Sequence, residues 1–327
     1  MSLLKHNLLV LGSQNFKKQD QKLTRDQIRP VQIIFKDGTV RDIDFFNFWG
    51  RVGVSSIAWD KRFPDELFVS ENEEIRRLNI VSKSYQILQL GRIGDIHDIH
   101  FLNDILWISN TEYDEAIGYD PLKNKVVQRI SLTPFRKIIE NKDEGFEKVI
   151  DRFHCNQVFL NFKNERCVLI HHITGWQFYR ILFEALVKQQ GDGGILNLET
   201  EEIFPLKLQS PHSVRLINDE YWIQDSGDKS IKIFDQEWKL KSTIELGGFG
   251  RGVAFSEDEN IGYIGLSATR KRYLKVIPTG NYLKNRIKIV DLMQKETLGE
   301  LVLSNIEQVD NVYILDDRML SVFQKLI

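Results

Sequence analysis

One motif recurs six times along the sequence, and this repetition limits the possible folds more than any other feature. Each copy has a small or polar residue, a short apolar stretch, a turn containing an acidic residue or asparagine, and a second apolar stretch with a polar end. The copies are SSIAWDKRFPDELFVSENE, HDIHFLNDILWISNTE, NQVFLNFKNERCVLIHHI, HSVRLINDEYWIQDSG, RGVAFSEDENIGYIGLSA and DNVYILDDRMLSVFQK. Repeats spaced by roughly 40 to 60 residues are typical of propellers. We therefore predict an all-β, six-bladed β-propeller that forms one domain over residues 1–327.

Short alternating apolar stretches support this prediction. Val31–Phe35 and Val40–Phe45 flank an Asp-Gly turn, which is the pattern of a β-hairpin. Each motif copy would form the inner and second strands of a blade. The chain between copies, as in residues 116–132 and 194–208, would form the two outer strands.

The last motif copy ends at the C-terminus with only two predicted strands, DNVYILDD and RMLSVFQK. We predict that the hairpin within residues 30–46 completes this blade, so that N- and C-terminal strands pair and close the propeller. Leu8–Gly12 also has the pattern of a strand, but the repeat gives it no place.

Two long segments interrupt the repeat. They are Thr133–Phe153 and Ile173–Gln190. The second has apolar residues at helical spacing, at positions 178, 181, 182, 185 and 186, and predicts a short amphipathic helix. This helix would either pack against a blade edge or serve as a substrate lid or partner surface.

The net charge of −2 gives no overall field that would attract nucleic acid or an anionic membrane. Basic residues do gather in the segment 270–288, which is typical of a solvated loop and strand face. The only cysteines, Cys155 and Cys167, lack zinc-binding spacing and suit a reducing compartment. The apolar run Leu8–Leu11 is too short for a signal peptide. We therefore expect a cytoplasmic protein that binds neither nucleic acid nor membrane.

The repeat also predicts which polar residues lie close together. The residue that leads into each inner strand of a propeller lies at the mouth of the central channel. These positions are Ser55, His97, Asn156, His212, Arg251 and Asp310, with Asp98 and His154 beside them. A second set lies at the ends of the second strands, at Ser70, Asn110, His172, Asp225 and Ser267.

Two kinds of chemistry fit these residues. His97, His154 and His212, with a carboxylate from Asp98, Asp225 or Asp310, have the donors that a divalent transition metal prefers. Alternatively, a histidine is a general acid or base, Arg251 binds an anionic group, and Asp98 or Asp310 orients the imidazole. A third interpretation is that the polar residues only bond to one another and to buried water.

The remaining residues of the two sets have supporting roles in this hypothesis. Ser55, Asn110, Asn156, Asp225 and Ser267 would contact the ligand, although Asp225 begins a tight turn and also fits a local role there. Cys155 adjoins His154, but neighbouring strand residues face opposite ways, which argues against a Cys–His nucleophile.

We therefore predict an enzyme with a small polar, anionic or sugar-like substrate and metal-assisted or His-mediated hydrolysis, lyase or isomerase chemistry. A divalent metal ion is the one cofactor that the residues indicate. The alternative is a non-catalytic propeller that binds a protein or glycan partner through its rim and the 173–190 segment.

Several motif segments also resemble those of one known family. The stretches GDIHDIHFLNDILWISNTE, HCNQV, SPHSVRLINDEYWIQDSG, GFGRGVAF and GYIGLSATRKR are similar, in this order, to segments of the domain of unknown function 4915 family of bacterial propellers. The resemblance covers His97 to Asp310 and implies a TolB-like six-bladed propeller, but no activity. The residues that match its motifs are His97, Asp98, Asn110, His154, Asn156, His212, Asp225, Arg251 and Ser267. Val214 and Leu216 depart from the proline and tryptophan common in the family.

Overall fold

The computed structural model describes residues 4–15, 17–135, 151–173, 191–268 and 284–327. The chain divides into two compact units. One unit, here called the terminal unit, contains Met1–Ile87 and Ile244–Ile327, and the other, the middle unit, contains Leu88–Thr243.

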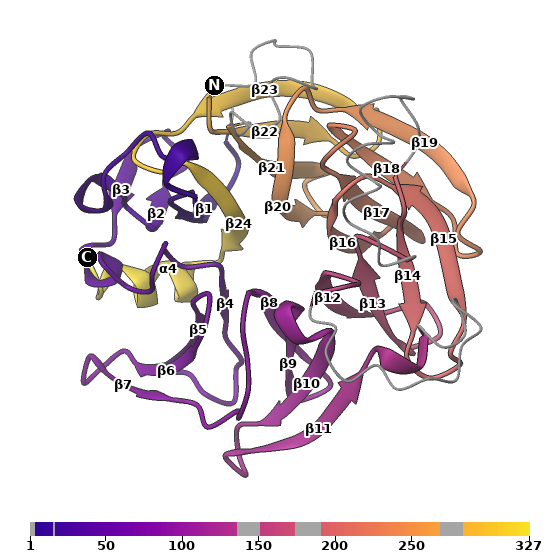
Figure 1. The fold of residues 1–327 in the computed structure, drawn as a ribbon. Coiled ribbons are helices and arrows are strands. Elements are labelled where there is room, and N and C mark those ends of the chain that lie inside the picture. Colours follow the sequence, from indigo (N-terminus) through magenta and orange to yellow (C-terminus); the bar gives the residue numbers. More distant parts are fainter. Residues whose placement is uncertain (1–3, 16, 136–150, 174–190, 269–283) are drawn as a thin grey trace. The chain divides into compact units, whose positions relative to one another are not determined.

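The middle unit is built from three four-stranded antiparallel sheets, which Figure 1 shows in magenta to orange. The first contains β8 (Ile96–Leu102), β9 (Ile105–Asn110), β10 (Glu115–Asp120) and β11 (Lys125–Ser131). The second contains β12 (Cys155–Leu160), β13 (Arg166–Ile170), β14 (Gly193–Asn197) and β15 (Ile203–Leu208). The third contains β16 (Pro211–Ile217), β17 (Glu220–Asp225), β18 (Ser230–Phe234) and β19 (Leu240–Glu245).

The terminal unit repeats this construction. Its first sheet contains β4 (Ser56–Ala58), β5 (Glu66–Ser70), β6 (Ile75–Asn79) and β7 (Ser84–Ile87). The second contains β20 (Phe249–Ser256), β21 (Ile261–Ser267), β22 (Arg286–Asp291) and β23 (Glu296–Val302). The third contains β24 (Gln308–Leu315), β1 (Asn7–Ser13), β2 (Val31–Ile34) and β3 (Val40–Asp42). The short helical segments of the terminal unit are η1 (Lys18–Asp20), η2 (Arg25–Gln27), η3 (Asp44–Phe46) and α4 (Asp317–Gln324), whereas η4 (Thr111–Tyr113) belongs to the middle unit.

These four-stranded sheets are the blades that the repeat predicts, and the fold class is a six-bladed β-propeller. Each motif copy from Ser55 to Arg251 supplies an edge strand and the second strand of its sheet, as predicted. The closure prediction is also confirmed, because β24 pairs antiparallel with β1 although the two strands lie at opposite ends of the chain (Figure 1).

The assignment of strands at the C-terminus was wrong in one respect. The predicted strand RMLSVFQK is the helix α4, and the second strand of this blade is β1, which contains the unassigned Leu8–Gly12. Asp316 caps the helix by accepting a hydrogen bond from the Met319 N–H at 2.7 Å. The buried residues Met319, Val322 and Phe323 follow helical spacing, so a helix buries them all on one face.

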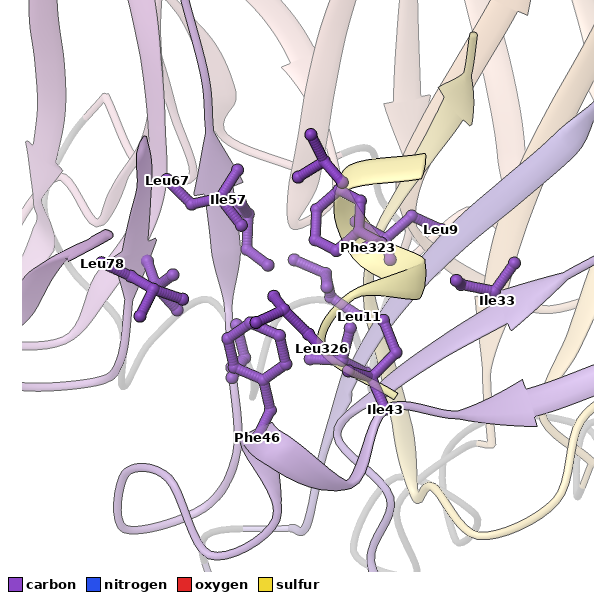
Figure 2. Close-up of a cluster of buried hydrophobic side chains, with 14 of the residues drawn as sticks. Leu9, Leu11, Ile33, Ile43, Phe46, Ile57, Leu67, Leu78, Phe323 and Leu326 are labelled. Carbon is purple, nitrogen blue, oxygen red and sulfur yellow. The ribbon is translucent and has the colours of Figure 1, made fainter. Parts of the chain in front are cut away.

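Helix α4 belongs to a hydrophobic core of the terminal unit. Figure 2 shows Phe323 and Leu326 among side chains of β1, β2 and β4, such as Leu9, Ile33 and Ile57. Phe323 is fully buried, which accounts for the helix staying against the sheets. The middle unit has its own cores, one of which packs Phe153 and Ile170 around β12 and β13.

Some predictions concern residues outside the described part of the chain. These residues include most of both predicted insertions, at 136–150 and 174–190, and most of the basic segment, at 269–283. The prediction of one domain over the whole chain stays a prediction. Within the described residues, none of the helices combines the length and apolar character that crossing a membrane requires.

Candidate functional site: a histidine ring in the middle unit

The first strand of each sheet in the middle unit has an irregularity close to the predicted site position. Pairing shifts between Ile96 and Ile99 in β8, between Cys155 and Gln157 in β12, and between His212 and Val214 in β16. A bulge of this kind leaves residues outside the regular pairing and changes the direction of their side chains. His97, Asp98 and Asn156 lie within these bulges, and His212 borders one.

The bulged strands bring histidines together. β12 packs against both β8 and β16, so that three strand starts come close within one unit. The rings of His97 and His154 have centroids 4.8 Å apart, and those of His97 and His212 are 6.1 Å apart. His171, directly after β13, lies 4.3 Å from His154 and 5.0 Å from His212. These four side chains form a closed set that we call the histidine ring.

Hydrogen bonds fix the tautomers of two members of the ring. His212 Nδ1 lies 2.9 Å from the Ser210 carbonyl oxygen, which can only accept, so Nδ1 donates. His154 Nδ1 lies 2.7 Å from a carboxylate oxygen of Asp151, which also accepts, so this Nδ1 donates as well. In the neutral form of each ring, Nε2 therefore carries the lone pair that could bind a metal or accept a proton.

Two acidic residues lie beside His97, and they have different neighbours. Asp95 Oδ2 is 3.5 Å from His97 Nε2, and donor atoms of Asp95, His97 and His154 all lie within 4.8 Å of one another. Asp98, the acidic residue expected beside His97, places Oδ2 3.1 Å from Nδ1 of His100.

Asp114 fixes the backbone that carries His154. Its carboxylate accepts the N–H groups of Arg152, Phe153 and His154 at 2.6, 2.9 and 3.2 Å. These contacts hold the backbone of His154 at φ of 51°, a left-handed conformation that residues other than glycine rarely adopt. Burial raises the pKa of Asp114 to about 6, and the negative charge of Asp151 adds to this, although the three N–H groups lower it.

Asn110 and Asp225, expected to contact a ligand, bond to the loops that precede two of the inner strands. Asn110 Oδ1 accepts the Gly94 N–H at 2.9 Å, next to Asp95, and its amide nitrogen donates to Glu115 at 3.0 Å. Asp225 accepts the Gln209 N–H at 2.6 Å, shortly before His212. Both side chains are buried and support the loops that position the ring.

Asn156 and Cys155 are both buried in β12. Asn156 donates from Nδ2 to the carbonyl of Pro211, so it links β12 to β16. Within the described residues its buried Oδ1 has no hydrogen-bond partner. Burial raises the pKa of the Cys155 thiol well above its ordinary value, and this opposes formation of a nucleophilic thiolate.

The other expected site residues belong to the terminal unit. Arg251 lies in a bulge of β20 and forms a largely buried ion pair with Asp310 of β24. Ser267 bonds through its hydroxyl group to the backbone of Val309, at 2.9 and 3.2 Å. Ser55 bonds to the Ser70 hydroxyl at 2.9 Å. The predicted channel, which would need residues of both units, stays a prediction.

The sequence-based list of site residues omitted Asp95 and His171. The copy of the motif that ends in HHI predicts a polar strand end at His172. In the structure His171 is the member of the ring, and its centroid is 5.7 Å from that of His172. Asp95 precedes its motif copy, in a left-handed loop position with φ of 45° that the sequence pattern does not reveal.

The fold defines the class of the protein as a β-propeller, and a comparison with family models supplies the family. The model for Domain of unknown function (DUF4915) matches residues 151–322, which is just over half of the chain. The chain belongs to this family. The matched part includes His154, His171 and His212 of the histidine ring, whereas Asp95 and His97 precede it. A search of curated proteins found no match.

Proposed function

We propose that this protein is an enzyme and that its reaction takes place at the histidine ring, on a small polar, anionic or sugar-like molecule. The observation that carries this proposal is the closed set of four imidazoles, with neighbouring centroids 4.3 to 6.1 Å apart. A propeller needs polar groups where its inner strands meet, but four adjacent imidazoles exceed what packing alone requires.

The chain's own groups would supply acid–base chemistry. His212 is held by Ser210 and by Ser226, whose hydroxyl lies 2.8 Å from Nδ1, so its Nε2 has the lone pair that a general base needs. Asp151 also orients the imidazole of His154, which lies next to His171 and so close to His212. Imidazole titrates close to neutral pH, and a positioned acid or base contributes about 10² to 10⁴ in rate. Hydrolysis, elimination and isomerisation all require such proton transfers.

The polar surroundings also support the substrate class. The rings of His171 and His212 are buried, and the Ser226 hydroxyl and the Asp151 carboxylate bond to histidines of the ring. A ligand here would have to exchange its hydrogen bonds with water for bonds to these groups, which favours a small hydroxylated or charged molecule.

A metabolite extract can test the proposal because it offers many candidate substrates at once. The purified protein is incubated with the extract, and polar compounds are compared by mass spectrometry with those from the double variant His154→Ala/His212→Ala. We expect at least one polar compound to be consumed at least 100-fold faster by the unmodified protein. His6→Ala is the matched control, because His6 belongs to the terminal unit and bonds to Tyr263.

The control should consume the compound within about twofold of the unmodified rate, because His6 lies outside the histidine ring and should act independently of it. Circular dichroism would verify that each variant is folded. If the unmodified protein and the double variant leave the extract with the same composition, the proposal of an enzyme is wrong.

A further inference from the structure

We propose that Asp95, His97 and His154 bind one divalent first-row transition-metal ion. The inference deepens the proposed function, since the ion would lie at the same histidine ring, but it stands on its own geometry. It also differs from the sequence-based set of His97, His154 and His212, because a carboxylate replaces the third imidazole.

The spacing of the donor atoms supports the site. Ligands at about 2.0 to 2.2 Å from a tetrahedral or octahedral metal lie about 3 to 3.5 Å from one another. Asp95 Oδ2 and His97 Nε2 are already 3.5 Å apart, and the full set lies within 4.8 Å. Small side-chain rotations would bring all three donors to bonding distance of one ion.

The orientation of the rings is also suitable. Two imidazoles bound to one metal at about 2.0 to 2.1 Å place their centroids about 4.5 to 5.5 Å apart. The His97 and His154 centroids are 4.8 Å apart, and the rings are inclined at 74°. The more distant His212 does not meet this criterion with His97, at 6.1 Å, which is why we assign it to acid–base chemistry instead.

The groups behind the ligands form the outer shell expected of a metal site. Metal-binding histidines commonly donate their second N–H to a carboxylate, and Asp151 accepts from His154 Nδ1 at 2.7 Å. Asp114 holds the backbone of His154, and Asn110 holds Gly94 next to Asp95. Each of the three ligands is thus positioned by its own strand or by a buried polar side chain.

The donor types select the class of metal. Two imidazoles with one carboxylate suit zinc, iron, cobalt or manganese, whereas magnesium and calcium prefer oxygen ligands throughout. A centre with three protein ligands also keeps coordination positions for water or substrate. The Asp95 side chain is 41% exposed, so the ion could reach the site from solvent.

Metal titration tests the proposal directly. The full-length protein, purified without a histidine tag and treated with chelator, is titrated with Zn²⁺ by calorimetry and with Co²⁺ by visible absorption. We expect one equivalent to bind. The variants Asp95→Asn, His97→Ala and His154→Ala should each weaken binding at least 10-fold, the smallest effect expected from loss of a group in a metal site.

Two neighbouring variants are the matched controls. Asp98→Asn and His100→Ala alter a carboxylate and an imidazole that contact each other beside the site. Both should bind Zn²⁺ within about threefold of the unmodified protein, and a large excess of Mg²⁺ should not displace Zn²⁺.

The results separate this inference from the proposed function. Less than a tenth of an equivalent of Zn²⁺ bound, or binding unaffected by Asp95→Asn and His97→Ala, would overturn the metal site while consumption of a metabolite could still be observed. Binding that is lost only in His171→Ala and His212→Ala would also overturn it, since the ion would then lie elsewhere in the ring. Metal binding without any metabolite consumed would support the metal site and contradict the enzyme.

Discussion

The middle unit and the terminal unit have similar bulged inner strands, but these strands carry different polar groups. In the middle unit the bulges of β8, β12 and β16 lie beside imidazoles of the histidine ring. In the terminal unit β20 and β24 have bulges at Arg251 and Asp310, and these two residues form an ion pair.

The difference shows that the same backbone feature, a bulge in an inner strand, can position residues that stabilise the fold or residues that could bind a ligand. The Arg251–Asp310 pair joins opposite charges on the inner strands of two separate sheets, so each of these largely buried charges has an oppositely charged partner. A neutral imidazole keeps one nitrogen lone pair, so the imidazoles of the histidine ring supply donors that could bind a metal or move a proton. We expect substitutions in the terminal unit to affect mainly stability and substitutions in the histidine ring to affect mainly ligands.

The ion pair gives the largest expected effect on stability. Arg251→Ala would leave Asp310, whose side chain is 8% exposed, as a buried charge without its cationic partner. Removing one member of a buried pair costs about 3 to 5 kcal/mol. The free energy of unfolding, measured with urea and far-ultraviolet circular dichroism, should fall by this amount.

A double variant sharpens this test. Arg251→Ala/Asp310→Ala should be less destabilised than the sum of the single variants, because the second change removes the unpaired charge. A loss below about 1 kcal/mol in Arg251→Ala would mean that the terminal pair is not a stabilising contact, and the contrast between the units would fail.

Asp114→Ala should have the next largest effect, and it would show how far the middle unit depends on a structural carboxylate. Three backbone N–H groups, those of residues 152–154, would lose their acceptor. We expect a loss of about 2 to 3 kcal/mol in the free energy of unfolding, because unsatisfied buried groups cost about 1 to 3 kcal/mol each.

Asp114→Asn is the control for this substitution, since it retains one acceptor oxygen and should lose less stability than the alanine variant. Zn²⁺ affinity of the folded alanine variant should also fall, because the backbone of His154 would no longer be fixed. An alanine variant as stable as the unmodified protein would show that the loop is held by other contacts.

The smallest expected effect is on the pH dependence of stability, and it involves Glu71 of the terminal unit. Burial raises the pKa of Glu71 to about 7, and Glu74 adds to the increase, although Arg76 and Arg25 oppose it. The folded state therefore binds this proton more tightly than the unfolded chain does. The stabilising contribution is full below about pH 4.5 and is lost as the pH rises through 7.

Glu71→Gln should remove this part of the pH dependence, an effect of about 1 kcal/mol after allowance for solvent screening. Urea denaturation at pH 5 and pH 8 would measure it in both proteins. Glu66→Gln is the matched control, because Glu66 lies on β5 of the same sheet and pairs with Arg77 instead. If the difference between the two pH values is the same in Glu71→Gln as in the unmodified protein, Glu71 is not the titrating group.

The sequence by itself determined the blades and the equivalent positions at the starts of their inner strands. Strand alternation and turn residues depend on neighbouring positions, so six similar motif copies could be aligned without any structure. The aligned repeats place His97, Asn156 and Arg251 at equivalent positions that lead into inner strands. The structure adds that these three residues lie in bulges.

Only the tertiary structure decided which of these polar residues meet and which segments complete a blade. Whether MLSVFQK formed a strand or a helix depended on the competition of distant β1 for the edge of β24 and on the core that buries Phe323. The pairing of Arg251 with Asp310 depended on contacts between separate sheets. His171 and Asp95 lie in the site because the backbone is left-handed at His154 and Asp95 and because β12 packs against β8 and β16. Such features arise from long-range contacts, which a local pattern of residues does not encode.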